Sequence, residues 1–130
     1  MKIIWKTIQK FINPSNHALG KLWHPAIARQ RKLTNRDIYE EMAVVSGLSV
    51  GDAGSNIETY WQVIIKRLMA GDRVPMGDYG TIALNLKTTG EPLEKDVTEN
   101  NIIANKPIFT PSEMLLDILK RAKYEKQEKP

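Results

Sequence analysis

The side chains best suited to chemistry in this sequence are lysines and arginines, which gather at the two ends of the chain. Residues 1–32 hold seven basic side chains and no acidic one, and residues 120–130 hold five basic and two acidic ones. The middle, residues 33–119, holds seven basic against thirteen acidic side chains. This distribution predicts that a polyanion contacts the ends of the chain, although terminal lysines also serve solubility alone.

Side chains that could perform catalysis are few. The chain has no cysteine, which excludes a disulfide, a thiolate nucleophile and a thiolate metal site. Its two histidines, His17 and His24, are too few for a multi-histidine metal centre. No glycine-rich phosphate loop, nucleophile elbow or zinc-ligand spacing occurs, and Glu40 and Glu41 are neighbours on one expected helix. We therefore expect no enzyme, no metal, no cofactor and no small-molecule substrate.

The length of 130 residues predicts one domain with a modest core, at a size where a partner subunit helps to bury apolar surface. The apolar start, residues 1–12, is interrupted by Lys6 and Lys10, and no small-residue cleavage site follows it. No segment approaches the roughly 20 apolar residues that a membrane span needs. We expect a cytoplasmic protein that does not enter a membrane.

Two helices are expected in the middle of the chain. Thr34 and Asp37 have the spacing of a capping box, and Gly47 stands where a left-handed cap would end the first helix. Ser49 and Asp52 repeat the capping pattern at the start of the second. The pattern predicts a helical pair joined by a short turn.

A wide apolar stripe runs along the second helix and ends near Gly71. It has helical spacing and consists of Ile57, Tyr60, Trp61, Ile64, Ile65, Leu68 and Met69. We expect Tyr60 and Trp61 to be core residues instead of a platform for a ligand. The stripe is wider than one short neighbouring helix can cover, which is consistent with a dimer.

Three strands and a final helix are expected next. The strands cover residues 73–76, 81–87 and 102–109, with a polar excursion over residues 88–101. Gly77 and Gly80 bracket a tight turn, and one of them is expected to have a positive φ. The helix runs from Ser112 to about Tyr124, with Thr110 as its cap and Pro111 in the first helical position.

The order of turn, strand, excursion, strand and capped helix resembles the bacterial histone-like HU and integration host factor family. Gly77-Asp78-Tyr79-Gly80-Thr81-Ile82 is similar to its Gly-Phe-Gly-Thr-Phe signature, and Pro107-Ile108-Phe109-Thr110-Pro111-Ser112-Glu113-Met114-Leu115 to its Pro-x-Phe-x-Pro-Gly-Lys-x-Leu signature. The resemblance implies an α+β fold over residues 33–124: a helical pair, a three-stranded sheet with a β-ribbon arm, and a C-terminal helix, in an intertwined homodimer.

The basic extension, residues 1–32, looks like the β-hairpin-like extension of an HU-like subgroup of Bacteroidetes type, and residues 125–130 form a charged tail. Periodicity leaves a rival for the first segment, because Ile4, Ile8 and Ile12 would share one face of a helix and the lysines the other. A strand is favoured, since isoleucine and tryptophan suit a sheet and the Asn13-Pro14 loop matches the subgroup. Strand and amphipathic helix both remain open at this point.

The family resemblance implies a nucleoid-associated protein that binds the phosphates of double-stranded DNA with little base readout. The matching contact positions on the strands are Lys87 and Lys106. The basic ends are expected to add six more contacts, at Arg29, Arg31, Lys32, Lys120, Arg121 and Lys123.

The sequence of the expected arm departs from the family. Residues 87–99 carry four acidic side chains and two lysines, and Pro92 is interpreted as a turn proline instead of a wedge between base pairs. Ser112-Glu113 replaces the family's Gly-Lys. The alternative function is therefore an HU-fold structural or protein-interaction module without DNA clasping, which would show little binding of duplex DNA even at low salt.

Overall fold

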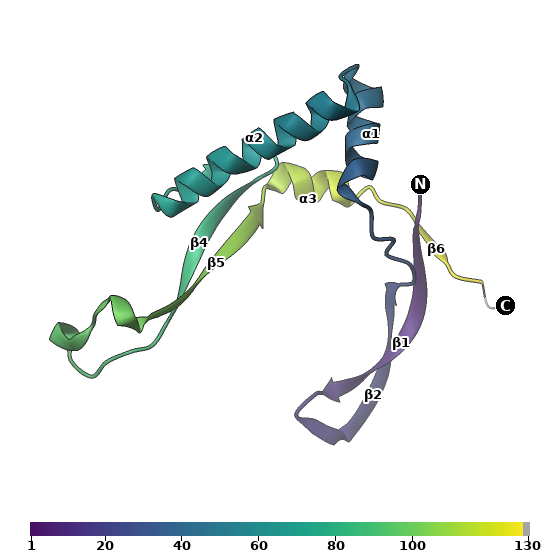
Figure 1. Ribbon diagram of the computed structural model, residues 1–130. Coiled ribbons are helices and arrows are strands. Elements are labelled where there is room, and N and C mark those ends of the chain that lie inside the picture. Colours follow the sequence, from purple (N-terminus) through teal and green to yellow (C-terminus); the bar gives the residue numbers. More distant parts are fainter. Residues whose placement is uncertain (129–130) are drawn as a thin grey trace. The chain divides into compact units, whose positions relative to one another are not determined.

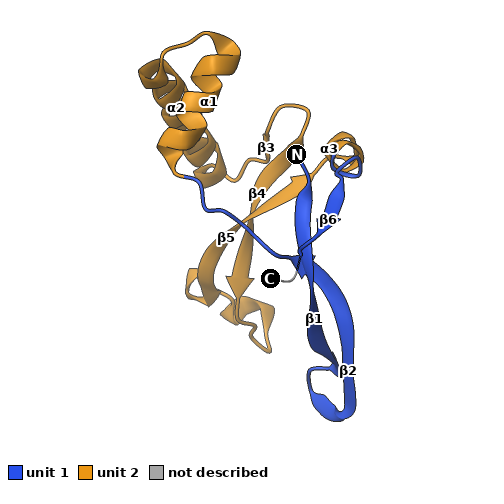
Figure 2. Ribbon diagram, turned by 90° about the vertical axis from the view of Figure 1, so that its right-hand side faces the viewer, with its two compact units in different colours: residues 1–33, 119–130 blue, residues 34–118 orange. Residues whose placement is uncertain are grey.

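The computed structural model describes residues 1–128, which form two compact units. Unit 1 contains residues 1–33 together with the segment that begins at residue 119, and unit 2 contains residues 34–118 (Figure 2). The grouping differs from the expected division into residues 1–32, 33–124 and 125–130. The division differs because a C-terminal strand pairs with an N-terminal strand and joins the two ends of the chain in one sheet.

Unit 1 is a three-stranded sheet of order β2-β1-β6. Strands β1 (Ile3–Asn13) and β2 (Asn16–Ile27) form an antiparallel hairpin whose turn is held by the Asn13 Oδ1, which accepts a hydrogen bond of 2.9 Å from the Ser15 amide. Strand β6 (Tyr124–Lys126) lies parallel to β1. The amphipathic helix considered for residues 1–12 is therefore wrong, and the strand interpretation is correct.

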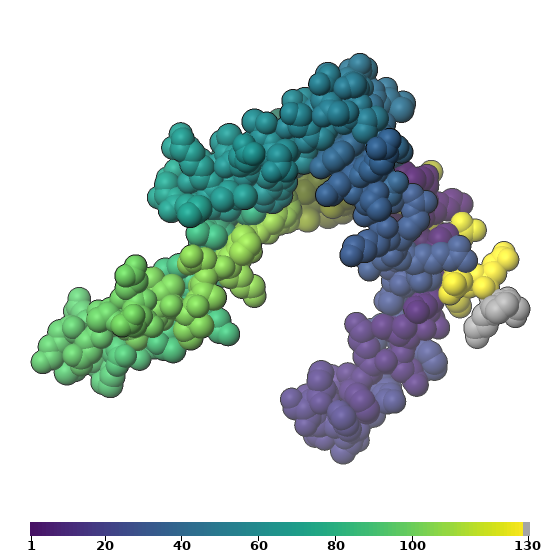
Figure 3. All heavy atoms as spheres, viewed as in Figure 1, coloured from purple at the N-terminus to yellow at the C-terminus, as the bar shows by residue number. Residues whose placement is uncertain are grey.

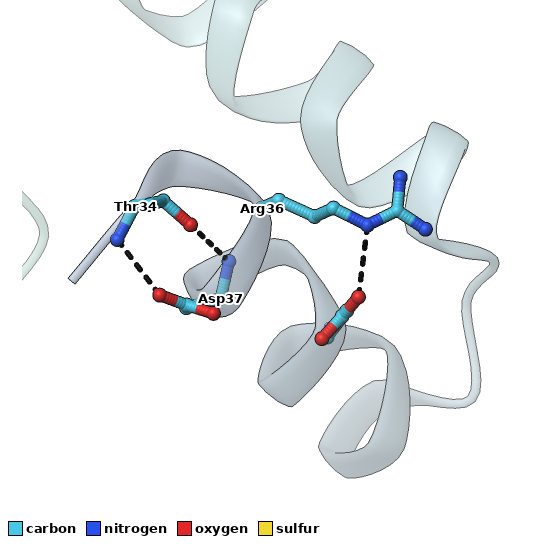
Figure 4. Close-up of polar contacts among 4 residues, drawn as sticks. Thr34, Arg36 and Asp37 are labelled. Carbon is cyan, nitrogen blue, oxygen red and sulfur yellow. Dashed lines mark hydrogen bonds and ion pairs between the residues drawn. The ribbon is translucent and has the colours of Figure 1, made fainter.

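Unit 2 begins with two capped helices, α1 (Asn35–Ser46) and α2 (Val50–Met69). The expected capping box is confirmed (Figure 4): Thr34 Oγ1 accepts from the Asp37 amide at 3.1 Å, and the Asp37 carboxylate accepts from the Thr34 amide at 2.8 Å. Gly47 ends α1 with φ of 75°, and Ser49 Oγ accepts from the Asp52 amide at 3.0 Å. Local capping chemistry thus sets both helix starts.

The sheet of unit 2 has the order β3-β4-β5 and is antiparallel. Its strands are β3 (Val74–Pro75), β4 (Gly80–Thr88) and β5 (Ile102–Pro111), of which β4 and β5 form a long twisted ribbon (Figure 1). Gly77 has a φ of 61°, which confirms the positive φ expected at Gly77 or Gly80. Glycine is required at position 80 for a different reason, because a Cβ atom there would lie 2.6 Å from the Thr110 carbonyl oxygen.

Ser112 joins the Gly77–Gly80 turn to the last helix, α3 (Glu113–Leu119). Its amide donates to the Tyr79 carbonyl at 2.9 Å, and its hydroxyl donates to the Asp78 carbonyl at 2.8 Å. The same oxygen accepts from the Leu115 amide at 3.1 Å, so Ser112 is the cap. The prediction of Thr110 as cap and Pro111 as first helical residue was wrong, because both lie in β5.

The end of α3 also differs from the prediction. The helix was expected to reach about Tyr124, but it ends at Leu119 and the chain then enters β6. The Ile3 amide donates to the Lys123 carbonyl at 2.8 Å, and the Gln127 amide donates to the Trp5 carbonyl at 2.7 Å. Pairing with β1 therefore takes up backbone groups of Lys123 and Tyr124 that a longer helix would have used, and it includes part of the expected tail.

The buried core of unit 2 is small. Ile64 and Leu68 of α2 pack with Val74 and Ile82 of the sheet, and Met76 and Leu84 contact this cluster. The apolar stripe of α2 is split, because Ile64 is fully buried whereas Trp61 is 43% exposed. In the single chain Tyr60 and Trp61 are thus not core residues as expected, because their side chains are 41% and 43% exposed, although the Tyr60 hydroxyl donates to the Pro75 carbonyl at 3.3 Å.

Candidate nucleic-acid interface

Lys87 and Lys106 lie on one face of the β4–β5 ribbon. Asn85 pairs with Lys106 and Lys87 pairs with Ala104, so the two lysines are diagonal neighbours across the ladder. Such neighbours have Cα atoms about 7–8 Å apart. Ile82 and Leu84 alternate to the opposite face, where they contact the core. The structure therefore brings the two predicted strand lysines together on the face of the ribbon that points away from the core.

The connection between β4 and β5 folds on itself around a buried amide. Asn101 donates from Nδ2 to Thr89 Oγ1 at 3.1 Å and to Glu91 Oε1 at 3.0 Å. Its Oδ1 accepts from the Thr98 amide at 2.9 Å. Residues 94–96 and 99–101 form short 3-10 turns within this loop. In Figure 3 the far part of the ribbon, in green, is a narrow projection of unit 2.

Acidic side chains dominate the connecting loop. Residues 89–101 carry four carboxylates and one lysine, and all five side chains are exposed. Phosphate groups near this loop would be repelled, because unscreened like charges within about 10 Å raise each other's energy. Asn101 was not predicted as an important residue, although Thr98 and Asn101 have the spacing of a capping box.

The other six predicted contact residues all belong to unit 1. Three follow β2 in an irregular segment and three lie between α3 and β6, and all are exposed: Arg29, Arg31, Lys32, Lys120, Arg121 and Lys123. The structure thus places the two basic ends of the chain in one compact body, whereas Lys87 and Lys106 belong to the other.

The two units differ strongly in charge. Within residues 1–128, unit 1 has eleven basic and two acidic side chains, a formal net charge of +9. Unit 2 has seven basic and thirteen acidic side chains, a net charge of −6. An approaching polyanion is therefore attracted by unit 1 and repelled by most of unit 2.

A further surface was missed by the sequence analysis. The face of unit 1 that carries Trp5 also carries Trp23 and Tyr124, two large and exposed aromatic side chains. The available signal was the alternation of β1, in which Ile3, Trp5 and Thr7 share one side of a strand. Tyr124 could not be added to this face without knowledge of the β1–β6 pairing.

No helix among residues 1–128 is long and apolar enough to cross a membrane. No group of three or more His, Asp or Glu side chains in the same residues could hold a metal ion.

Comparisons with known proteins place the fold. A family model described as HU-HIG, an HU domain fused to wHTH, Ig, or glycine-rich motif, matches residues 1–126. One similar solved structure is a protein of Bacteroides vulgatus ATCC 8482, described as a candidate bacterial DNA-binding protein. It is 15% identical with a TM-score of 0.66, and the alignment covers 100% of this chain and 51% of that one. The chain thus spans about half of that protein's length, and at this identity the likeness shows the fold. A search of curated proteins found no match.

Proposed function

Because the chain belongs to the HU-HIG family of HU domains fused to wHTH, Ig, or glycine-rich motifs, we propose that it is a histone-like protein that binds double-stranded DNA. It contacts phosphates with little base readout, acts by binding and not by catalysis, and works at the bacterial nucleoid. The observation that carries this proposal is the separation of charge between the units, with +9 on unit 1. Phosphate neutralisation by lysine and arginine supplies essentially all of non-specific DNA affinity.

The proposed form is a homodimer joined through the helices of unit 2. Trp61, Ile65 and Met69 form a continuous line on α2, and their exposed fractions rise from 43% to 51% and 81%. Helix α1 adds an open apolar groove of about 450 Å³ that includes Ile38 and Met42. A second copy would cover this surface, which a single soluble chain rarely leaves in water.

Two groups of contacts are proposed for duplex DNA. Lys87 and Lys106 contact phosphates from the β4–β5 ribbon, and a dimer presents this pair twice. The remaining contacts come from the six basic residues of unit 1 described above. Because the loop of residues 89–101 is acidic, we propose that the duplex is not clasped by the tip of this ribbon.

The test is the salt dependence of binding to a generic duplex, followed by fluorescence anisotropy. The variant R29Q/R31Q/K32Q keeps β1 and β2 intact, whereas deletion of residues 1–32 would also remove the strand with which β6 pairs. Each lost phosphate contact should reduce the slope of log K against log salt by about 0.9 and weaken all duplex sequences alike. K87A/K106A removes two contacts from each chain and four from the proposed dimer, so it should reduce the slope by about 3.6.

A matched control removes two positive charges elsewhere in unit 2. Lys66 on α2 and Lys95 in the acidic loop are exposed and lie outside the ladder positions of Lys87 and Lys106. K66A/K95A changes the net charge by the same amount as K87A/K106A. An equal slope for these two variants would show that only total charge matters and would refute the assigned contacts on the ribbon.

The second candidate function is a protein-interaction module of HU-like fold. The observation that favours it is the loop of residues 89–101, which carries four exposed carboxylates and whose two sides are joined by hydrogen bonds of Asn101. This candidate predicts little binding of duplex DNA even at low salt. Failure of the wild-type chain to bind duplex DNA at low salt would refute the DNA-binding proposal and favour the protein-interaction module.

A further inference from the structure

One face of the unit 1 sheet is apolar, aromatic and open. Register places Trp5 opposite Ile27, Thr7 opposite Pro25 and Ile3 opposite Tyr124, so these side chains share one side of the sheet. Trp23 stands further along β2 on the same side, opposite Gln9. Trp23 is 66% exposed and Tyr124 is 64% exposed. Large aromatic rings left in water on this scale mark an interaction surface.

This face is hollowed into a groove of about 660 Å³. Trp23 and Ile27 of β2 both line the groove and are about 13 Å apart at the usual rise per residue, and Ile3 and Tyr124 line it beyond Trp5. Pro25 and Thr7 form the floor between Trp23 and Ile27. The volume lies within the range of about 300–1,000 Å³ that is typical of small-molecule sites.

The charges around the groove are positive. The Lys126 ammonium lies 5.6 Å from the centre of the Trp5 ring, and the Lys21 ammonium lies 4.7 Å from that of Phe11. The strand-paired residues on this face include both lysines and no carboxylate, since Glu125 pairs with Ile4 on the opposite face. An anionic ligand with planar groups therefore complements the surface in both shape and charge.

We propose that this groove binds single-stranded nucleic acid. Unpaired bases stack on Trp23, Trp5 and Tyr124, and Lys21 and Lys126 meet the phosphates that connect them. The same sheet already holds one aromatic stack, because the His17 ring lies parallel to Phe11 with ring centres 3.7 Å apart. This activity goes beyond the duplex binding proposed above.

A single strand fits the groove better than a duplex does. The bases of a duplex are stacked on one another and expose only their edges, whereas unpaired bases offer a planar face to an aromatic side chain. Stacking on proteins tolerates any base, so we expect little sequence preference. A sheet face with exposed rings and adjacent lysines supplies both parts of this mode of binding.

The experiment measures binding of the full chain to labelled oligothymidylate and oligouridylate of about 12 nucleotides, a length within the site sizes of about 4–16 nucleotides known for single OB folds. The variants are W23A and Y124A, whose side chains are exposed enough for the fold to survive. Each should weaken binding of the single strand by about 5- to 150-fold, which corresponds to the loss of one stacked base. Affinity for a duplex should stay unchanged.

Matched controls lie on the other face of the same hairpin. Leu22 is next to Trp23 on β2, is 52% exposed and pairs with Lys10. L22A should bind the single strand as the wild type does, and K21Q should weaken it more than K10Q does. A higher affinity for oligothymidylate would identify DNA as the preferred single strand, and a higher affinity for oligouridylate would identify RNA. Both outcomes support the proposal.

Three results would overturn this inference. Wild-type chain that binds no oligonucleotide at low salt would exclude the site. W23A with unchanged affinity would exclude stacking on that ring. Loss of self-association in W23A, measured by sedimentation, would show that a second copy covers the groove. Because duplex binding is measured on the same variants, a failure of the groove is distinguished from a failure of the proposed duplex function.

Discussion

Replacement of Trp61 by alanine should weaken the proposed dimer strongly. An aromatic side chain of this size buries up to about 250 Å², so the 43% that is exposed in the single chain amounts to about 100 Å². At about 25 cal/mol per Å² this is about 2.5 kcal/mol for each protomer and about 5 kcal/mol for the dimer, as an upper bound. Because buried area converts incompletely to affinity, we expect Kd to rise by about 100-fold, which is less than the full value of about 5 kcal/mol would give.

The assay is sedimentation equilibrium over a range of micromolar concentrations, with Q62A as the matched control. Gln62 is exposed on α2 and lies outside the apolar stripe, so its removal should leave the monomer–dimer equilibrium unchanged. Circular dichroism at matched concentrations reports whether the helices are retained. A wild-type chain that is a stable monomer, or a Kd that is equal for W61A and Q62A, would refute the assignment of this stripe to the dimer interface.

Three further predictions concern the fold that holds the candidate sites. G80A should lower the free energy of unfolding by about 1–3 kcal/mol, because the added Cβ would lie 2.6 Å from a backbone oxygen. G90A should leave this free energy unchanged, because a Cβ at that position would have no heavy atom within 4 Å. Chemical denaturation compares the two variants. N101A removes three hydrogen bonds and should speed amide exchange in residues 89–101 above the wild-type rate. T34A removes the cap of α1 and should cost about 1 kcal/mol in the same denaturation assay.

Features set by neighbouring residues could be predicted from the sequence. The capping box of Thr34 and the left-handed cap at Gly47 each depend on residues no more than four positions apart. The turn at Gly77 depends on backbone freedom at one residue. Such patterns are visible in the sequence because the interacting groups are close along the chain.

Features set by distant pairing could not be predicted. Tyr124–Lys126 becomes a strand because β1, more than a hundred residues earlier, offers free backbone groups to it. The local pattern of residues 112–124 favours a continued helix, and tertiary pairing overrides this preference. Trp5 and Tyr124 could not be assigned to one surface from the sequence, because only the pairing of β1 with β6 brings them together.

The charge pattern shows how this pairing bears on function. Two basic segments at opposite ends of a sequence would act as separate tethers, each with a small effect on a phosphate backbone. Joined by the β1–β6 ladder, they form one body of net charge +9, while the HU-like helices and ribbon keep −6. Because the attraction of a polyanion rises with the charge that one folded body carries, we expect unit 1 to attract a polyanion more strongly than the same side chains on separate tethers. The pairing of Tyr124–Lys126 with β1 therefore also brings the basic side chains of both chain ends into one folded unit.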